Sequence, residues 1–455
     1  MTTKDSNKRS KGMRALLLLG LATTLMANKP MVVNVDNPHF RKIITTIPKF
    51  TIHKSTPERQ DIADFGQRRL GYLLAYSRLF RVVPPATYEK NTMQVRDFQK
   101  LGVEVLIKGE LIGSGRKTSL MLKAIDLRRK KIITQRQYDN VSRQNIDRIL
   151  RLYGNQILMT YTKKSGIFFS KIAFVGKRRK QDHKQIYVMD FDGSNLEQIT
   201  NSKAHHLSPS WSPDNRYIVY TSFVDDNPDL FIYDRLIKKH RKISGRAGVN
   251  SGGQFAHKGN LVAFTGSMRG DTDIFITDTQ GSKRQRLIRG LGLDVDPTFS
   301  PNGKWLAFVS GRYGNPHIFR ATLNWQDNRL RVIDDKRLTY AGWYNANPSW
   351  SPDSQKIAFA GYDRDIDRFD IFLMNSDGSN LERMTLDRGD NESPSWSPNG
   401  MMLAFFSTRV PNSGRKGQAQ IYVMSRDGSE QRMIATGLYE ARTPRWSRDG
   451  GIKAN

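Results

Sequence analysis

Short apolar runs bounded by Gly, Asp and Pro recur through the last two-thirds of the chain. Runs of this length and bounding predict strands joined by tight turns rather than helices. Dipeptides such as Asp377-Gly378 and Asp427-Gly428 supply the positive φ angles that two-residue hairpins need. In five successive units the first predicted strand covers 217–221, 261–265, 305–309, 356–360 and 402–406, and the second covers 230–234, 273–277, 317–321, 370–374 and 420–424.

Each unit begins with a Pro-x-Trp-Ser-Pro-Asp/Asn motif or a variant of it, as in Asn347–Asp353 and Ser393–Gly400. The second copy, Gly252–Gly259, lacks the prolines. Repeats of 44 to 51 residues overlap the period of four-stranded propeller blades. We therefore interpret the aromatic residues as packing between blades and not as a catalytic signature. The aromatic positions are Trp211, Phe255, Phe299, Trp350, Trp396 and Trp446.

The two ends of the repeat region complement each other. Residues 171–200 contain three predicted strands with no motif before them, while the last motif, at 443–450, has almost no chain after it. Joined together they make one blade, which gives six blades and removes exposed sheet edges at the seam. The predicted fold class is α+β: a small N-terminal α/β domain followed by a six-bladed β-propeller closed by strand exchange between its N- and C-terminal ends.

Residues 29–165 show a different pattern. Glu58–Tyr76 has apolar residues on one broad side, with Thr56 as a predicted cap and Pro57 in the first turn, and a second helix is predicted from about Ser142 to Tyr161. The predicted domains are a signal peptide at 1–28, an α/β domain at 29–165 and a propeller at 166–455. Predicted strands in the α/β domain are 31–35, 42–47, 80–83, 103–108, 119–126 and 131–135.

Composition and charge narrow the range of possible functions and locations. The chain of 455 residues has a net charge of +30, of which residues 1–165 hold +20 and residues 166–455 hold +10. The absence of cysteine excludes disulfides, thiolate metal sites and cysteine nucleophiles. A basic segment followed by the apolar stretch Ala15–Met26 predicts an export signal cleaved near Ala27. An uncleaved anchor is the alternative. We expect a periplasmic protein that does not meet nucleic acid.

The order of signal, α/β domain and six repeats, together with the blocks Gly166–Val175 and Ile186–Thr200, resembles the TolB family of the Tol–Pal envelope system. The resemblance implies a monomeric protein-binding scaffold without catalysis, which joins the outer-membrane lipoprotein Pal to the Tol inner-membrane complex for envelope integrity and division. It implies that Pal binds at the mouth of the central channel. The candidate binding residues lie just before each motif's Pro (Ser208, Gly252, Asp296, Asn347, Ser393, Thr443) or nearby (His205, Asn250, Asp294, Asn345, Glu392, Arg442).

The segment Asn28–Val35 stands where the family docks on TolA, although an ordinary first strand is at least as good an interpretation. The chain has no Gly-x-Ser-x-Gly elbow, His-Glu-x-x-His helix or phosphate-binding Gly-Lys loop. We expect no cofactor and no metal: the pair His205-His206 and the acidic stretch Asp363–Asp370 match no ligand spacing. The alternative functions are an exported propeller enzyme or glycan-binding protein, and a basic protein held to anionic headgroups through residues 29–165.

Overall fold

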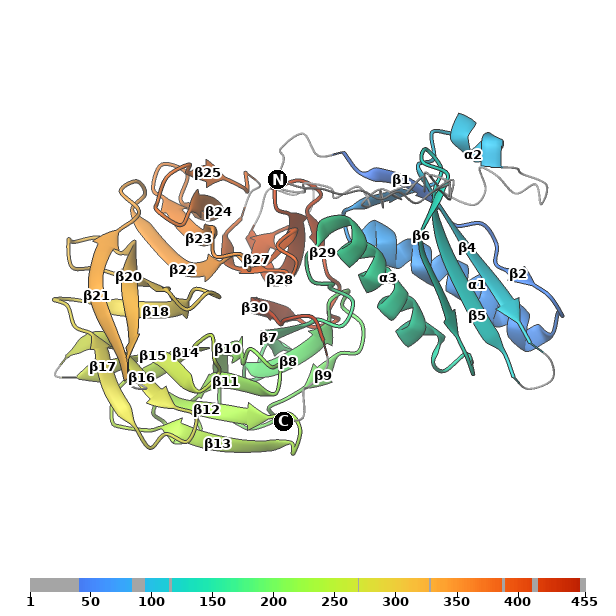
Figure 1. The fold of residues 1–455 in the computed structure, drawn as a ribbon. Helices are drawn as coiled ribbons and strands as arrows, with labels where there is room; N and C mark the ends of the chain where they lie inside the picture. Colours follow the sequence, from blue (N-terminus) through green and yellow to red (C-terminus); the bar gives the residue numbers. More distant parts are fainter. Residues whose placement is uncertain are drawn as a thin grey trace, which may run out of the picture.

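The computed structural model describes residues 41–83, 95–113, 117–268, 270–326, 329–386, 389–410 and 416–450. The predicted signal peptide, the cleavage point near Ala27, the strand at 31–35 and the segment Asn28–Val35 lie outside these residues. Figure 1 shows a ring of sheets on one side and a sheet covered by two helices on the other.

The N-terminal part is built on a mixed sheet in the order β3-β1-β4-β5-β6, with β2 paired to β4. β1 runs parallel to β3 and β4, and β4, β5 and β6 are antiparallel. The predicted strands of this domain that fall on described residues are thereby confirmed, with shifted ends. The strands are β1 (Ile43–Thr46), β2 (Thr51–Ile52), β3 (Phe80–Val82), β4 (Val105–Ile112), β5 (Ser119–Asp126) and β6 (Lys131–Tyr138).

Helices α1 (Pro57–Tyr76) and α3 (Ile146–Thr162) pack together over one face of this sheet (Figure 1). Thr56 caps α1 as predicted, because its hydroxyl accepts a hydrogen bond from the Arg59 backbone N–H at 3.3 Å. Both predicted helices are confirmed, α3 starting four residues later than expected. The short helix α2 (Val95–Lys100) was not predicted, and its Phe98 packs on the opposite face of the sheet.

The C-terminal part contains, within the described residues, six four-stranded antiparallel sheets. They form a ring in which each motif strand is the innermost of its sheet (Figure 1). Five sheets are β10 (His206–Trp211) to β13 (Lys239–Ser244), β14 (Asn250–Phe255) to β17 (Arg284–Ile288), β18 (Asp294–Phe299) to β21 (Arg329–Arg337), β22 (Tyr344–Trp350) to β25 (Glu382–Arg383), and β26 (Asn391–Trp396) to β29 (Arg432–Met433).

The middle strands of these five sheets are β11 (Tyr217–Ser222), β12 (Asp229–Asp234), β15 (Leu261–Met268), β16 (Asp271–Asp278), β19 (Trp305–Ser310), β20 (His317–Gln326), β23 (Lys356–Asp363), β24 (Arg368–Asn375), β27 (Met402–Arg409) and β28 (Lys416–Ser425). They are apolar on both faces because each sheet packs between two neighbours. The buried clusters of the ring accordingly draw residues from adjacent sheets.

The sixth sheet has the order β30-β7-β8-β9 and combines the two ends of the repeat region. Its strands are β30 (Glu440–Trp446), β7 (Lys171–Lys177), β8 (Gln185–Asp190) and β9 (Glu197–Gln198). β30 runs antiparallel to β7, with Trp446 opposite Ile172 and Glu440 opposite Lys177. No helix in the described part of the chain is long and apolar enough to cross a membrane.

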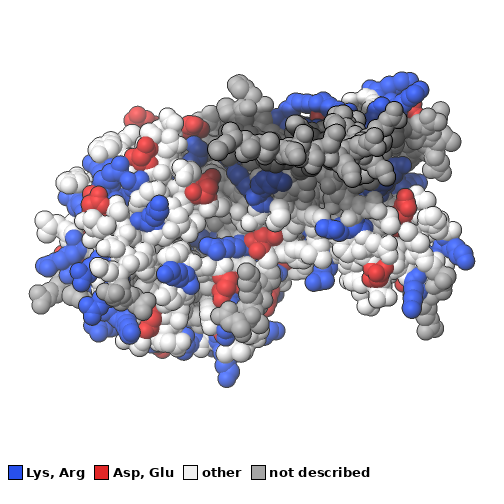
Figure 2. Space-filling view, in the orientation of Figure 1, with Lys and Arg blue, Asp and Glu red and all other residues white. Residues whose placement is uncertain are grey.

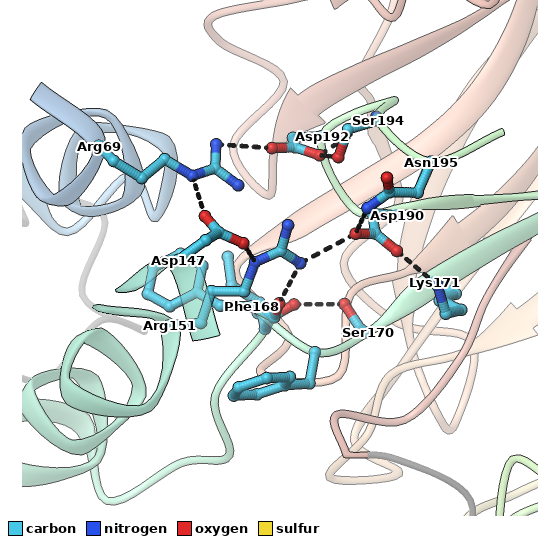
Figure 3. Close-up of polar contacts among 12 residues, drawn as sticks. Arg69, Asp147, Arg151, Phe168, Ser170, Lys171, Asp190, Asp192, Ser194 and Asn195 are labelled. Atoms are coloured by element: carbon cyan, nitrogen blue, oxygen red, sulfur yellow. Dashed lines mark hydrogen bonds and ion pairs between the residues drawn. The ribbon is translucent and has the colours of Figure 1, made fainter. Parts of the chain in front are cut away.

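A buried charged network joins the two parts of the molecule (Figure 3). The Arg151 guanidinium of α3 donates to Asp147 Oδ2 at 2.7 Å and, at 3.0 Å, to Oδ2 of Asp190, the last residue of β8. Lys171 Nζ reaches the other oxygen of Asp190 at 2.5 Å. Burial alone raises the pKa of Asp190, but Lys171, Asn195 and Arg151 outweigh it and hold that pKa below its usual value.

Helix α1 joins the same network through Arg69, which donates to Asp147 at 2.6 Å and to Asp192 at 3.0 Å. The Tyr76 hydroxyl donates to the Phe191 carbonyl at 2.5 Å. One apolar cluster also runs without interruption from the helices into strands β30, β7 and β8 and into strands β27 and β28. The two parts therefore share a continuous core.

Candidate functional site: the central channel

The innermost strand of each sheet bends at the same position, the residue immediately before the motif's first Pro or, in the second copy, before Gly253. That residue has a positive φ in all six motifs, between 48° and 67°. At the same place the pairing register shifts, which is a β-bulge. The six residues are Ser208, Gly252, Asp296, Asn347, Ser393 and Thr443, the first group that the sequence predicted.

A positive φ suits Gly, Asn and Asp better than other residues. Gly252, Asp296 and Asn347 therefore meet the bulge at little cost. Thr443 is β-branched, has φ of 48°, and its buried hydroxyl has no hydrogen-bond partner among the described residues. The six residues that the sequence groups together thus occupy the same place in the innermost strand of each blade.

Three of the six form a chain of hydrogen bonds from blade to blade. Asn347 Nδ2 donates to Asp296 Oδ2 at 3.0 Å, and the Ser393 hydroxyl donates to Asn347 Oδ1 at 3.2 Å. The backbone N–H of Asp296 donates to the Thr265 hydroxyl at 3.3 Å. We call the six residues the polar ring, since uncharged polar groups and one carboxylate make up most of it.

Burial raises the pKa of the Asp296 carboxyl, and the positive charge of Arg445 only partly offsets this effect. Burial likewise lowers the pKa of Arg445, against the stabilising charge of Asp296. The two groups attract each other, but no hydrogen bond joins them among the described residues. The channel thus holds one acid and one base that are short of direct partners.

The second group of predicted residues divides into two. Asn250, Asp294 and Asn345, each five positions before the aromatic residue of its motif, are at most 2% exposed. Asp294 pairs with Arg312 at 3.3 Å, and Asn345 donates to the His317 ring at 2.9 Å. Their side chains are therefore held inside their blades. The remaining three, His205, Glu392 and Arg442, have accessible side chains, and Arg442 pairs with Glu440.

A cavity of about 610 Å³ occupies the end of the channel at which the innermost strands finish. All six motifs line it, and its basic groups include Arg445, Arg448 and His257. The sequence predicts the partner-binding mouth at the opposite end, where these strands start. Arg445 was missed, although it occupies the motif position held by Ser210, Gln254, Thr298, Ser349 and Ser395, and that register was the available signal.

The aromatic residues of the motifs are structural, as predicted. Trp211 Nε1 donates to the Arg445 carbonyl at 2.8 Å, and Trp396 Nε1 donates to the Ser349 carbonyl at 3.2 Å. Each of these bonds reaches the innermost strand of the preceding blade. The described residues hold no group of three His, Asp or Glu side chains with metal-binding geometry.

The six four-stranded blades around a polar channel, together with the α/β domain that precedes them, place the chain in the class of two-domain β-propeller proteins. The family model of the TolB beta propeller domain matches residues 159–448, and the chain belongs to that family. The crystal structure of TolB from Acinetobacter baumannii superposes with a TM-score of 0.75, over 90% of this chain and 97% of that one, at 22% identity. This likeness shows the fold.

Two curated relatives carry the name Tol-Pal system protein TolB. The one from Desulfosudis oleivorans is 32% identical over 254 residues, which are 53% of this chain and 56% of the relative. The one from Syntrophus aciditrophicus is 29% identical over 211 residues, 44% and 46% of the two chains. The chain spans about half the length of the curated relatives that it matches.

Proposed function

We propose that this protein is an exported scaffold of a Tol–Pal system. Its propeller would bind a Pal-like peptidoglycan-associated lipoprotein of the outer membrane. Its N-terminal segment Asn28–Val35 would bind a TolA-like inner-membrane protein. The proposal includes periplasmic location after cleavage near Ala27, a monomeric state, a domain division at 165/166, and no catalysis. The names of the relatives and the match over residues 159–448 support it.

The observation that carries the proposal is the polar ring with its accessible neighbours. Asp296 and Asn347 present a hydrogen-bonded polar surface across two blades, and the buried Ser393 hydroxyl of a third blade holds Asn347 in place, which suits a polar protein partner. Glu392 lies in the same sector, one residue before Ser393. A preorganised surface of this kind loses little freedom when a partner binds. Association of this type would support envelope integrity and outer-membrane constriction during division.

The test is binding of the same organism's Pal-like protein to the mature chain, measured by calorimetry. We expect binding that the charge reversals Asp296→Lys and Glu392→Lys each weaken by at least about tenfold, because they place a like charge against a complementary surface. Glu382→Lys is the control: Glu382 is exposed on the outer strand β25, away from the channel. Absence of binding at tens of micromolar, or equal loss in the control, contradicts the proposal.

A further inference from the structure

A second cavity, of about 560 Å³, lies on the outside of the ring between two neighbouring blades. One wall is the end of β13 and the residues after it, and the other is the β16–β17 hairpin, lower left in Figure 1. Gly281 lets the hairpin approach: its φ is 77°, and a Cβ there would lie 2.4 Å from the Ile243 carbonyl oxygen. The cavity is separate from the channel.

The lining of this cavity is basic and contains no carboxylate. Figure 2 shows blue side chains mixed with red ones over most of the propeller face in view, so a lining without acids is a local departure. The lining residues are Lys242, Ile243, Ser244, Gly245, Arg246, Thr277, Gly281, Ser282 and Arg284.

Lys242 is already neutralised, since its Nζ contacts Asp225 at 2.5 Å and Asp229 at 2.8 Å. Arg246 and Arg284 differ, because neither forms an ion pair with any described residue. Arg246 is exposed at the rim. Arg284 lies deeper, and its guanidinium stacks 4.1 Å from the centre of the Phe275 ring. The cavity therefore holds two uncompensated positive charges.

Comparison with other blades shows what is missing around Arg284. In the next blade Arg312, which follows β19 and so comes from a different strand, stacks on Phe319, the equivalent of Phe275, and pairs with Asp294. The residue equivalent to Asp294 in the blade of Arg284 is Asn250, which accepts only a long 3.4 Å bond from Arg284 Nη1. The neighbouring carboxylate, Asp273, is engaged by Arg286 at 2.5 Å. An amide thus stands where the next blade has the compensating acid.

Two buried donors of the lining have no partner among the described residues: Arg284 Nε and the hydroxyl of Thr277, which is 1% exposed. Buried donors without partners cost free energy, and a bound acceptor removes that cost. Burial and the like charge of Arg246 also lower the pKa of Arg284, which an anion would reverse. The Ser282 hydroxyl is already committed to Asp278.

We propose that this cavity binds a phosphomonoester group, held by Arg246, Arg284 and the Thr277 hydroxyl. Guanidinium groups match phosphate oxygens with paired, charge-assisted hydrogen bonds. The cavity volume lies in the range of small-molecule sites, so it accommodates a phosphate together with the group that carries it. The ligand is either a soluble phosphorylated sugar or the headgroup of a phosphorylated lipid.

The experiment measures binding to the full mature chain at constant ionic strength. The soluble probes are inorganic phosphate, glucose 6-phosphate and uncharged glucose, followed by calorimetry. The lipid probe is phosphatidylcholine vesicles with and without phosphatidic acid, followed by cosedimentation. We expect glucose 6-phosphate or phosphatidic acid vesicles to bind, and glucose and plain vesicles not to bind; which probe binds identifies the source.

Arg284→Gln and Arg246→Gln should each weaken binding by at least about tenfold, since each removes a charge-assisted contact. Arg331→Gln, at an exposed position of β21, is the matched control and should leave binding unchanged. Arg246 is exposed, so its variant decides the matter if Arg284→Gln does not fold. No binding of any phosphorylated probe at about 10 mM overturns the proposal, and so does equal weakening in the control.

Discussion

Both the junction between the two parts of the molecule and the central channel contain buried charged side chains, but their surroundings shift the pKa of the buried aspartate in opposite directions. At the junction Asp190 receives Arg151, Lys171 and Asn195, so its charged form is stabilised. In the channel Asp296 receives only the amide and backbone N–H of Asn347, so its charged form is disfavoured. Complete pairing suits a fixed joint, and incomplete pairing leaves a surface able to accept a partner.

The two regions also differ in origin. The channel is assembled from six copies of one motif, so each blade supplies one residue to the polar ring. The junction is assembled from α1 and α3, which have no copies in the chain, and from the end of β8 and the turn after it. Variants at the junction should therefore affect stability, and variants in the channel should affect binding with smaller effects on stability.

The largest expected effect is at the junction. Arg151→Met should lower the free energy of unfolding by about 3 kcal/mol, because it leaves Asp147 and Asp190 without their shared buried partner. Urea unfolding followed by circular dichroism measures the change. The control is Arg148→Met, an exposed arginine of the same helix, which should change stability by less than about 0.5 kcal/mol. Equal effects of the two substitutions contradict a fixed joint.

The next effect separates the two carboxylates by pH. The pKa of Asp190 is depressed, so its stabilisation is present above the unfolded value of about 3.9 and is lost as pH falls further. Asp190→Asn should therefore cost about 2 kcal/mol at pH 7 and progressively less below pH 4. Stability at a series of pH values, from thermal or urea unfolding, measures both variant and wild type.

Asp296→Asn is the matched counterpart. The pKa of Asp296 is raised in the folded protein. Its contribution to stability is therefore fully present at pH values below the pKa of an unfolded aspartate, and it declines as the pH rises through the pKa of the folded state. Asp296→Asn removes this loss of stability at high pH, and the new amide keeps an oxygen that accepts the hydrogen bond from Asn347 Nδ2. It should not lower stability at pH 7. A loss as large as that of Asp190→Asn would show that the channel carboxylate is as well paired as the junction one.

The same two regions explain what the sequence could predict. The blades can be predicted from the sequence because the pattern of strand, turn and strand repeats every 44 to 51 residues along the chain. The junction depends on contacts such as Arg69 with Asp192, which join residues 123 apart through charges that have no pattern along the chain. The helix α2 has only six residues, too few for a helical period to be recognised.

The bulge explains how the candidate residues divide between the channel and the blade interiors. In a regular strand alternate residues face opposite sides, so a side chain's face can be counted along the chain. The bulge at each polar-ring residue breaks this count, because the pairing shifts between, for example, Val295 and Thr298. The sequence therefore predicts both groups as one binding surface, whereas the structure places Ser208 and its equivalents at the bulge and buries Asn250, Asp294 and Asn345 inside their blades.

The smallest expected effect tests whether that bulge stores strain in the channel. Thr443 has a β-branched side chain at φ of 48° and a buried hydroxyl without a described partner, whereas the equivalent Asn347 tolerates this conformation and bonds Asp296. Thr443→Asn should therefore raise the free energy of unfolding by about 1 kcal/mol, measured by urea unfolding. Thr51→Asn, at an exposed position of β2, is the control and should change it by less than about 0.5 kcal/mol. A loss of stability in Thr443→Asn would mean that the threonine methyl packs well enough to offset its strained backbone.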